Sequence, residues 1–181
     1  MSKTFVISDT HFSHKNILTF TNGEKPLRPF SSMEEMDEYM ISKWNSVVSP
    51  EDHVIHLGDV VFAQTGFECL GKLNGKKTLL MGNHERHKLS KYLEYFDDIR
   101  AYKEYNDCIL SHIPVHESQF ERWKANIHGH THSISVKKNY ALFGEVDDPR
   151  YFCVSVEQIN YTPILITDVL NKLRERGIEV K

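Results

Sequence analysis

The chain has 181 residues, of which 40% are hydrophobic and 26% are charged, and these values match a soluble globular domain and exclude disordered, collagen-like and coiled-coil proteins. Its formal net charge of −3 gives no overall positive field that would hold long nucleic acid nonspecifically through its phosphates. The 3 cysteines lie far apart, which indicates neither a disulfide framework nor a thiolate zinc site. We therefore expect one cytoplasmic domain over residues 1–181, without membrane insertion, because no apolar run approaches the roughly 20 residues of a spanning helix.

The order of apolar and polar residues predicts an alternation of strands and helices. A strand at 4–8 comes first, and a helix follows at 32–48, where Ser32 and Glu35 make a capping box. The remaining predicted elements are strands at 53–57 and 78–81, a helix at 88–96, strands at 108–112, 125–129 and 151–156, and a helix at 167–176. This alternation indicates an α/β fold.

Asp, Asn or His residues stand at the carboxyl ends of five of these strands. They belong to the blocks Asp9-Thr10-His11, Gly58-Asp59, Gly82-Asn83-His84-Glu85, Ser111-His112 and Gly129-His130-Thr131-His132. Because open α/β sheets build their sites at the carboxyl ends of the strands, we expect these side chains to lie close together. Carboxylate, amide and imidazole groups are ligands of divalent metals, so the pattern predicts a metal enzyme.

In order and in residue type, these five blocks resemble the motifs of the calcineurin-like metallophosphoesterase superfamily. A narrower likeness, to small phosphoesterases of bacteria and phages, rests on the segments at 9–17, 28–30, 44–45 and 56–59. The resemblance implies a four-layer α-β-β-α sandwich of two mixed sheets, with a dimetal site at the strand ends. It does not identify the substrate or the oligomeric state.

The resemblance also implies two divalent metal ions. One would be held by Asp9, His11, Asp59 and His132, and the other by Asp59, Asn83, His112 and His130. Asp59 would bridge the two ions. This mixture of ligands suits manganese, iron, zinc, nickel or cobalt, and we expect manganese. A hydroxide bridging the ions would be the nucleophile, and His84 matches the histidine with which the family protonates the leaving oxygen, as general acid.

Two further residues are predicted to contact the substrate phosphate. His14 lies one turn beyond His11, and Arg28 in the following loop could form bidentate hydrogen bonds to phosphate. The remaining histidines are interpreted as surface or packed core residues, namely His53, His56, His87, His116 and His128.

The chain departs from the protein phosphatases of the superfamily at two positions. Phe62 stands where those enzymes keep the aspartate that orients the catalytic histidine, and Ala63 stands in place of an arginine that clamps phosphate. A diester carries one negative charge fewer than a terminal phosphate and needs that clamp less.

We therefore expect a phosphodiesterase that hydrolyses a small nucleotide-type phosphodiester or an oligonucleotide end. The alternatives are a phosphomonoesterase, a dinucleotide pyrophosphatase, or a non-catalytic protein-binding scaffold of the same fold. The presence of His84 argues against the scaffold, because the scaffold subunit of the superfamily lacks that histidine.

Overall fold

The computed structural model describes residues 2–140 and 144–181. Its central feature is a five-stranded sheet of order β13-β1-β4-β5-β6, in which β13 is antiparallel to β1 and the other neighbours are parallel. In that order the strands are Ile164–Leu165, Thr4–Ile7, His53–His56, Lys76–Leu80 and Asp98–Arg100. Because β1, β4 and β5 run parallel, their carboxyl ends meet at one edge of the sheet.

A second sheet of four strands faces the first and has the order β12-β9-β8-β7. The strands are Tyr151–Cys153, Ala125–His128, Cys108–Ser111 and Tyr102–Tyr105. The first three are parallel, whereas β7 pairs antiparallel with β8. A parallel bridge between Ser8 and Ser155 joins the ends of β1 and β12. The expectation of an α/β fold with two mixed sheets is confirmed.

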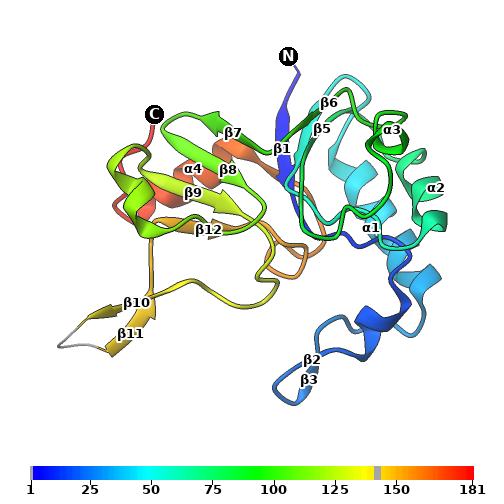
Figure 1. The fold of residues 1–181 in the computed structure, drawn as a ribbon, viewed down its shortest axis with the longest axis horizontal. Coiled ribbons are helices and arrows are strands. Elements are labelled where there is room, and N and C mark those ends of the chain that lie inside the picture. The colour runs from blue at the N-terminus through cyan, green and yellow to red at the C-terminus, as the bar shows by residue number, and fades with distance from the viewer. Residues whose placement is uncertain (1, 141–143) are drawn as a thin grey trace.

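In the described part of the chain, four α-helices and three 3-10 helices complete the body, and two hairpins project from it (Figure 1). The α-helices are α1 (Met33–Val47), α2 (Phe67–Leu70), α3 (Leu89–Tyr92) and α4 (Ile166–Glu175). The 3-10 helices are η1 (Lys15–Thr19), η2 (Gln64–Gly66) and η3 (Glu117–Glu121), and the hairpins pair β2 (Thr21–Asn22) with β3 (Lys25–Pro26) and β10 (Lys137–Tyr140) with β11 (Gly144–Asp147). Among the described residues, no helix is both long and apolar enough to cross a membrane.

The predicted helix bounds were right to within one residue for α1, whereas the helix predicted around α3 was too long. The Ser32 side chain caps α1 by accepting from the backbone N–H of Glu35 at 3.1 Å. The Glu35 carboxylate does not return the bond to Ser32, because it accepts from the backbone N–H of Ser31 at 2.8 Å. The helix predicted at 88–96 is a single turn, α3.

Two apolar clusters bury the first sheet from both sides. On one face, Phe5 and Ile7 of β1 pack with Met36, Met40 and Trp44 of α1. On the other face, a second cluster combines inward-facing residues of both sheets with the apolar side of α4, namely Val6, Ile55, Leu80, Leu110, Ile127, Val154, Val169, Leu170 and Leu173. The strand β1 is therefore fixed in the centre of the molecule, and so is the loop that follows it.

Candidate metal centre

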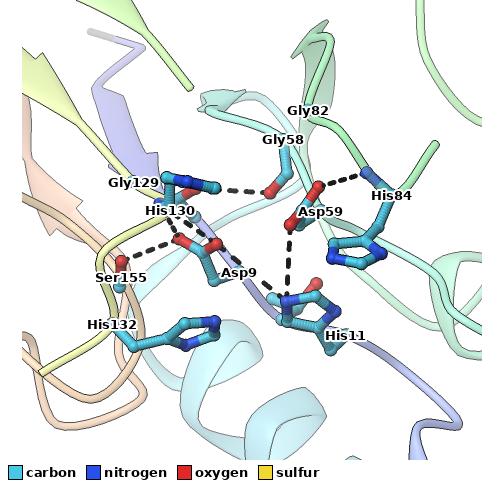
Figure 2. A network of polar contacts seen from close by, with 12 residues as sticks. Asp9, His11, Gly58, Asp59, Gly82, His84, Gly129, His130, His132 and Ser155 are labelled. Carbon is cyan, nitrogen blue, oxygen red and sulfur yellow. Dashed lines mark hydrogen bonds and ion pairs between the residues drawn. The ribbon is translucent and has the colours of Figure 1, made fainter. Parts of the chain in front are cut away.

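The predicted metal ligands lie together in loops that directly follow the parallel strands. Asp9 and His11 follow β1, Asp59 follows β4, and Asn83 follows β5. His112 follows β8 in the second sheet, and His130 and His132 follow β9. The two sheets therefore deliver ligand-type side chains to one place from opposite sides (Figure 2).

The donor atoms form two adjoining groups. Asp9, His11 and His132 make one group and Asp59, His112 and His130 the other, and within each group the donor atoms lie within 4.8 Å of one another. Asp59 lies between them, because its Oδ2 is 3.6 Å from His11 Nε2 and 3.3 Å from His112 Nε2. Asn83 Oδ1 is 2.9 Å from His112 Nε2 and so joins the second group. This arrangement has the shape of two metal positions that share one carboxylate.

The chemistry of His11 fits a metal ligand. Its ring is buried, and neither Nδ1 nor Nε2 has a hydrogen-bond partner among the described residues. A buried polar atom without a partner is costly, and a divalent cation would satisfy it. Burial also lowers the pKa of His11 well below its usual value, so the ring is neutral and carries the lone pair that a metal requires.

The carboxylate of Asp59 is suited to the bridging position. Burial opposes its ionisation, but the hydrogen bond from His112 and the charge of that ring hold the pKa of Asp59 well below its usual range. The other Asp59 oxygen, Oδ1, accepts from the backbone N–H of His84 at 2.8 Å. Asp59 is thus an ionised group with a fixed orientation.

Most of the predicted ligands have a left-handed backbone. The φ angles are 60° at Asp9, 48° at His11, 57° at Asp59, 68° at His130 and 50° at His132. Non-glycine residues adopt this region rarely, and such strain persists only where the surrounding structure enforces it, characteristically at functional sites. The sequence blocks therefore specify backbone geometry as well as ligand type.

Two glycines of the motifs allow these loops to approach one another. A Cβ atom at Gly82 would collide with Asp59, and one at Gly129 would collide with Ser8 and Asp9. Neither position has space for a side chain, so glycine is needed there for close packing against the two aspartates.

Three residues to which the sequence analysis gave no role support the ligands and their loops. Ser155 Oγ donates to Asp9 Oδ2 at 2.7 Å, and Glu157 Oε1 accepts from His132 Nδ1 at 3.0 Å. Glu85 accepts from the backbone N–H of Gly82 at 2.5 Å. Ser155 and Glu157 follow β12, so the same pattern of polar residues after a strand could have revealed them.

The prediction that Arg28 contacts the substrate is contradicted. Its guanidinium is fully buried, and Nε donates to Glu157 Oε1 at 2.8 Å. Nη1 donates to the Thr10 carbonyl at 2.8 Å and Nη2 to the Asp9 carbonyl at 2.5 Å. Arg28 therefore braces the strained loop after β1 and is not available to a phosphate.

The other substrate candidate, His14, lies at the edge of the centre. Its Nδ1 accepts from the backbone N–H of Ile17 at 2.8 Å and caps η1. Its ring centroid is 5.6 Å from that of His11. A contact of His14 with substrate remains a prediction.

His84 lies beside both groups, with its ring centroid 5.5 Å from that of His11. Arg86 Nη2 is 3.3 Å from His84 Nδ1. Because arginine can only donate, Nδ1 is the acceptor in this contact, and the proton of the neutral ring lies on Nε2. Arg86 was not singled out by the sequence analysis.

The histidines interpreted as core residues behave accordingly. His128 is buried with Nδ1 2.8 Å from the Gly129 carbonyl oxygen, and burial lowers its pKa to about 4. His56 is buried with Nε2 3.1 Å from Thr10 Oγ1, and burial lowers its pKa to about 3. Both rings are therefore neutral packing residues.

Comparison with known proteins identifies the family. The model of the calcineurin-like phosphoesterase family matches residues 2–171, nearly the whole chain. The chain belongs to the calcineurin-like phosphoesterase family. As a member of this family, it is a metal-dependent phosphoesterase, and the two groups of ligand-type side chains agree with the two metal ions of such enzymes.

Relatives of this phosphoesterase occur in an archaeon, a bacterium and a phage. The uncharacterised protein MJ1445 of Methanocaldococcus jannaschii is 37% identical over 189 residues, which cover 100% of this chain and 96% of the relative. The Gene 66 protein of Mycobacterium phage L5 is 29% identical over 169 residues, 74% of this chain and 79% of the relative. The crystal structure of AQ665, a protein of unknown function from Aquifex aeolicus, has a TM-score of 0.69 at 28% identity and covers 94% of this chain and 99% of that chain. The expected likeness to small bacterial and phage proteins agrees with these matches.

Proposed function

We propose that this protein is a dimetal phosphodiesterase that hydrolyses a small nucleotide-type phosphodiester or an oligonucleotide end. The observation that carries the proposal is the pair of adjoining ligand groups with Asp59 between them. In this proposal one ion is held by Asp9, His11, Asp59 and His132, and the other by Asp59, Asn83, His112 and His130. We expect manganese to support activity, because mixed carboxylate, amide and imidazole ligation suits it.

When bound, the two ions supply an activated water as nucleophile and a positive clamp for the phosphoryl oxygens. The residues of the chain orient the metal ligands and protonate the leaving oxygen. The backbone N–H of His84 donates to the Asp59 carboxylate. This hydrogen bond fixes the position of the proposed general acid, His84, relative to the proposed bridging ligand, Asp59. As the imidazolium, His84 would donate its Nε2 proton to the leaving oxygen and become the neutral ring, whose Nδ1 accepts from Arg86 once the remaining proton has moved to Nε2.

Two features support a diester rather than a terminal phosphate as substrate. The Arg28 guanidinium is turned to Glu157 and to backbone carbonyls, so it provides no bidentate clamp for a dianion. Phe62, with 37% of its surface exposed, lies at the edge of the site where protein phosphatases carry an aspartate. An apolar ring suits an esterified substituent of the phosphate better than a further charge.

The test is a comparison of two substrates after metal removal. The full chain is treated with chelator, dialysed, reloaded with manganese, and assayed on bis-p-nitrophenyl phosphate and on p-nitrophenyl phosphate. We expect hydrolysis that depends on manganese, with a higher kcat/KM for the diester. A higher kcat/KM for the monoester would overturn the diesterase assignment. Absence of turnover on any phosphate ester with two ions bound would favour the scaffold.

A further inference from the structure

A row of four rings runs along the edge of the metal centre and ends at His84. The centroid of Phe20 is 5.9 Å from that of His14, which is 3.6 Å from Phe62, and Phe62 is 6.1 Å from His84. Phe20 is 49% exposed and Phe62 is 37% exposed. Two large apolar side chains are therefore partly open to solvent, Phe62 beside the proposed general acid and Phe20 on the far side of His14.

The backbone holds this row in place. The Phe62 N–H donates to the Phe12 carbonyl at 3.0 Å, and the Phe12 N–H donates to the Val60 carbonyl at 2.9 Å. At the other end of the row, the Leu27 N–H donates to the Phe20 carbonyl at 2.8 Å. The first two bonds tie the loops after β1 and β4 to each other, and the third closes the β2–β3 hairpin. The rings are therefore presented by an ordered backbone, which a ligand need not order on binding.

We propose that Phe62 and Phe20 form a base-stacking subsite for the nucleoside that departs with the leaving oxygen. This inference rests on the proposed function, in which His84 protonates that oxygen. A base attached to the leaving group would lie on the His84 side of the phosphate, next to Phe62. An aromatic ring binds the face of any nucleobase, so the subsite selects nucleotides over other phosphate esters without selecting one base.

The test measures binding, so its result does not depend on turnover. The manganese-loaded full chain is titrated calorimetrically with AMP and with ribose 5-phosphate, which share the phosphate and the sugar and differ by the base. We expect the wild-type protein to bind AMP more tightly. Phe62→Leu should lower AMP affinity on the order of 10-fold, and Phe20→Leu should lower it by less, because Phe20 lies further from His84. Both variants should bind ribose 5-phosphate within about 2-fold of wild type.

Two further variants make the result specific. Phe62→Trp restores an aromatic face and should keep AMP affinity, which excludes a folding defect as the cause. Tyr102→Leu removes another exposed aromatic side chain, 50% exposed on β7, and should have no effect on either ligand. Equal affinity of wild type for the two ligands, absence of binding of both, or an equal loss for both in Phe62→Leu would overturn the subsite. If AMP is preferred but no phosphodiester is hydrolysed, the proposed function fails and the stacking surface stands.

Discussion

Replacing Glu157 by glutamine should weaken the metal position that includes His132. The Glu157 side chain is buried between His132 Nδ1 at 3.0 Å and Arg28 Nε at 2.8 Å. Burial raises the pKa of Glu157, but the charges and hydrogen bonds of Arg28 and His132 prevail and hold it below its usual value, so the group is a carboxylate at neutral pH. Such a carboxylate directs the free nitrogen of a ligating histidine toward the metal, and its loss characteristically lowers metal affinity by about 10- to 100-fold.

The same change should also lower stability. Glutamine keeps an oxygen for hydrogen bonding but leaves the buried Arg28 without an opposite charge, which costs about 3 kcal/mol when a buried pair is broken. Both effects are measurable on the same protein, by manganese titration of the folded apoprotein and by urea denaturation in the presence of chelator.

Two variants serve as controls for this experiment. Glu157→Asp withdraws the carboxylate from both His132 and Arg28 by one methylene but keeps a negative charge near the buried Arg28, so it should lose metal affinity and retain more stability than Glu157→Gln. Glu38→Gln, at an exposed position of α1, should change neither quantity. Wild-type affinity for two ions in Glu157→Gln would refute the role of Glu157 in positioning His132.

Three other outcomes follow from the structure. Asp59→Asn should lower the affinity for both metal ions together, because Asp59 lies between the two groups, and loss of a single ion in a binding titration would refute the bridge. The His84→Ala variant should still bind two metal ions, but its kcat on a diester with a poor leaving group should be lower by about 100-fold or more. Loss of a metal ion in this variant would show instead that His84 is a ligand. His116→Ala is the control and should change neither quantity. Burial raises the pKa of Asp37 to about 6, so between about pH 4 and pH 6 the folded protein retains a proton that the unfolded chain releases. The free energy of unfolding, measured in the presence of chelator, should therefore fall by about 1 to 3 kcal/mol as the pH rises through this range. Urea denaturation of Asp37→Asn should lack this fall, and an unchanged pH profile in that variant would contradict the reasoning.

The parallel strands and their polar ends could be predicted from sequence because local signals coincide there. A β-rich run followed by Asp9 or Asp59 marks a strand and its carboxyl end within a few residues. Other strands lack such signals. β6 and β13 have only three and two residues, and their positions at the sheet edge are decided by pairing with distant strands.

Helical spacing alone misled the prediction for residues 88–96. Leu89 and Leu93 are four residues apart, as on one face of a helix, but they are 51% and 56% exposed. Tyr92 and Phe96 are buried in the first apolar cluster, so only part of the apolar surface of the segment packs against the core, and the segment forms a single turn. Periodicity therefore located the buried residues but overestimated the length of the helix.

The direction of a long side chain was not accessible from sequence. Arg28 lies 129 residues from Glu157 in the chain, yet their side chains form an ion pair in the interior. An arginine in a loop near a predicted phosphate site therefore gave a reasonable but wrong hypothesis. The pairing of Glu157 with Arg28 could not be predicted for the same reason, because the two residues lie in loops near opposite ends of the chain.

The left-handed backbone at Asp9, His11, Asp59, His130 and His132 has a consequence for how this protein can change. Each such position carries a conformational cost of order 1 kcal/mol that glycine would relieve and asparagine would reduce. A laboratory selection for thermal resistance alone would therefore favour substitutions that dismantle the metal centre while leaving the two apolar clusters intact. Such selection would yield stable variants that keep the fold but lack the metal ligands. Retention of the fold in a variant would therefore not indicate that it retains phosphoesterase activity.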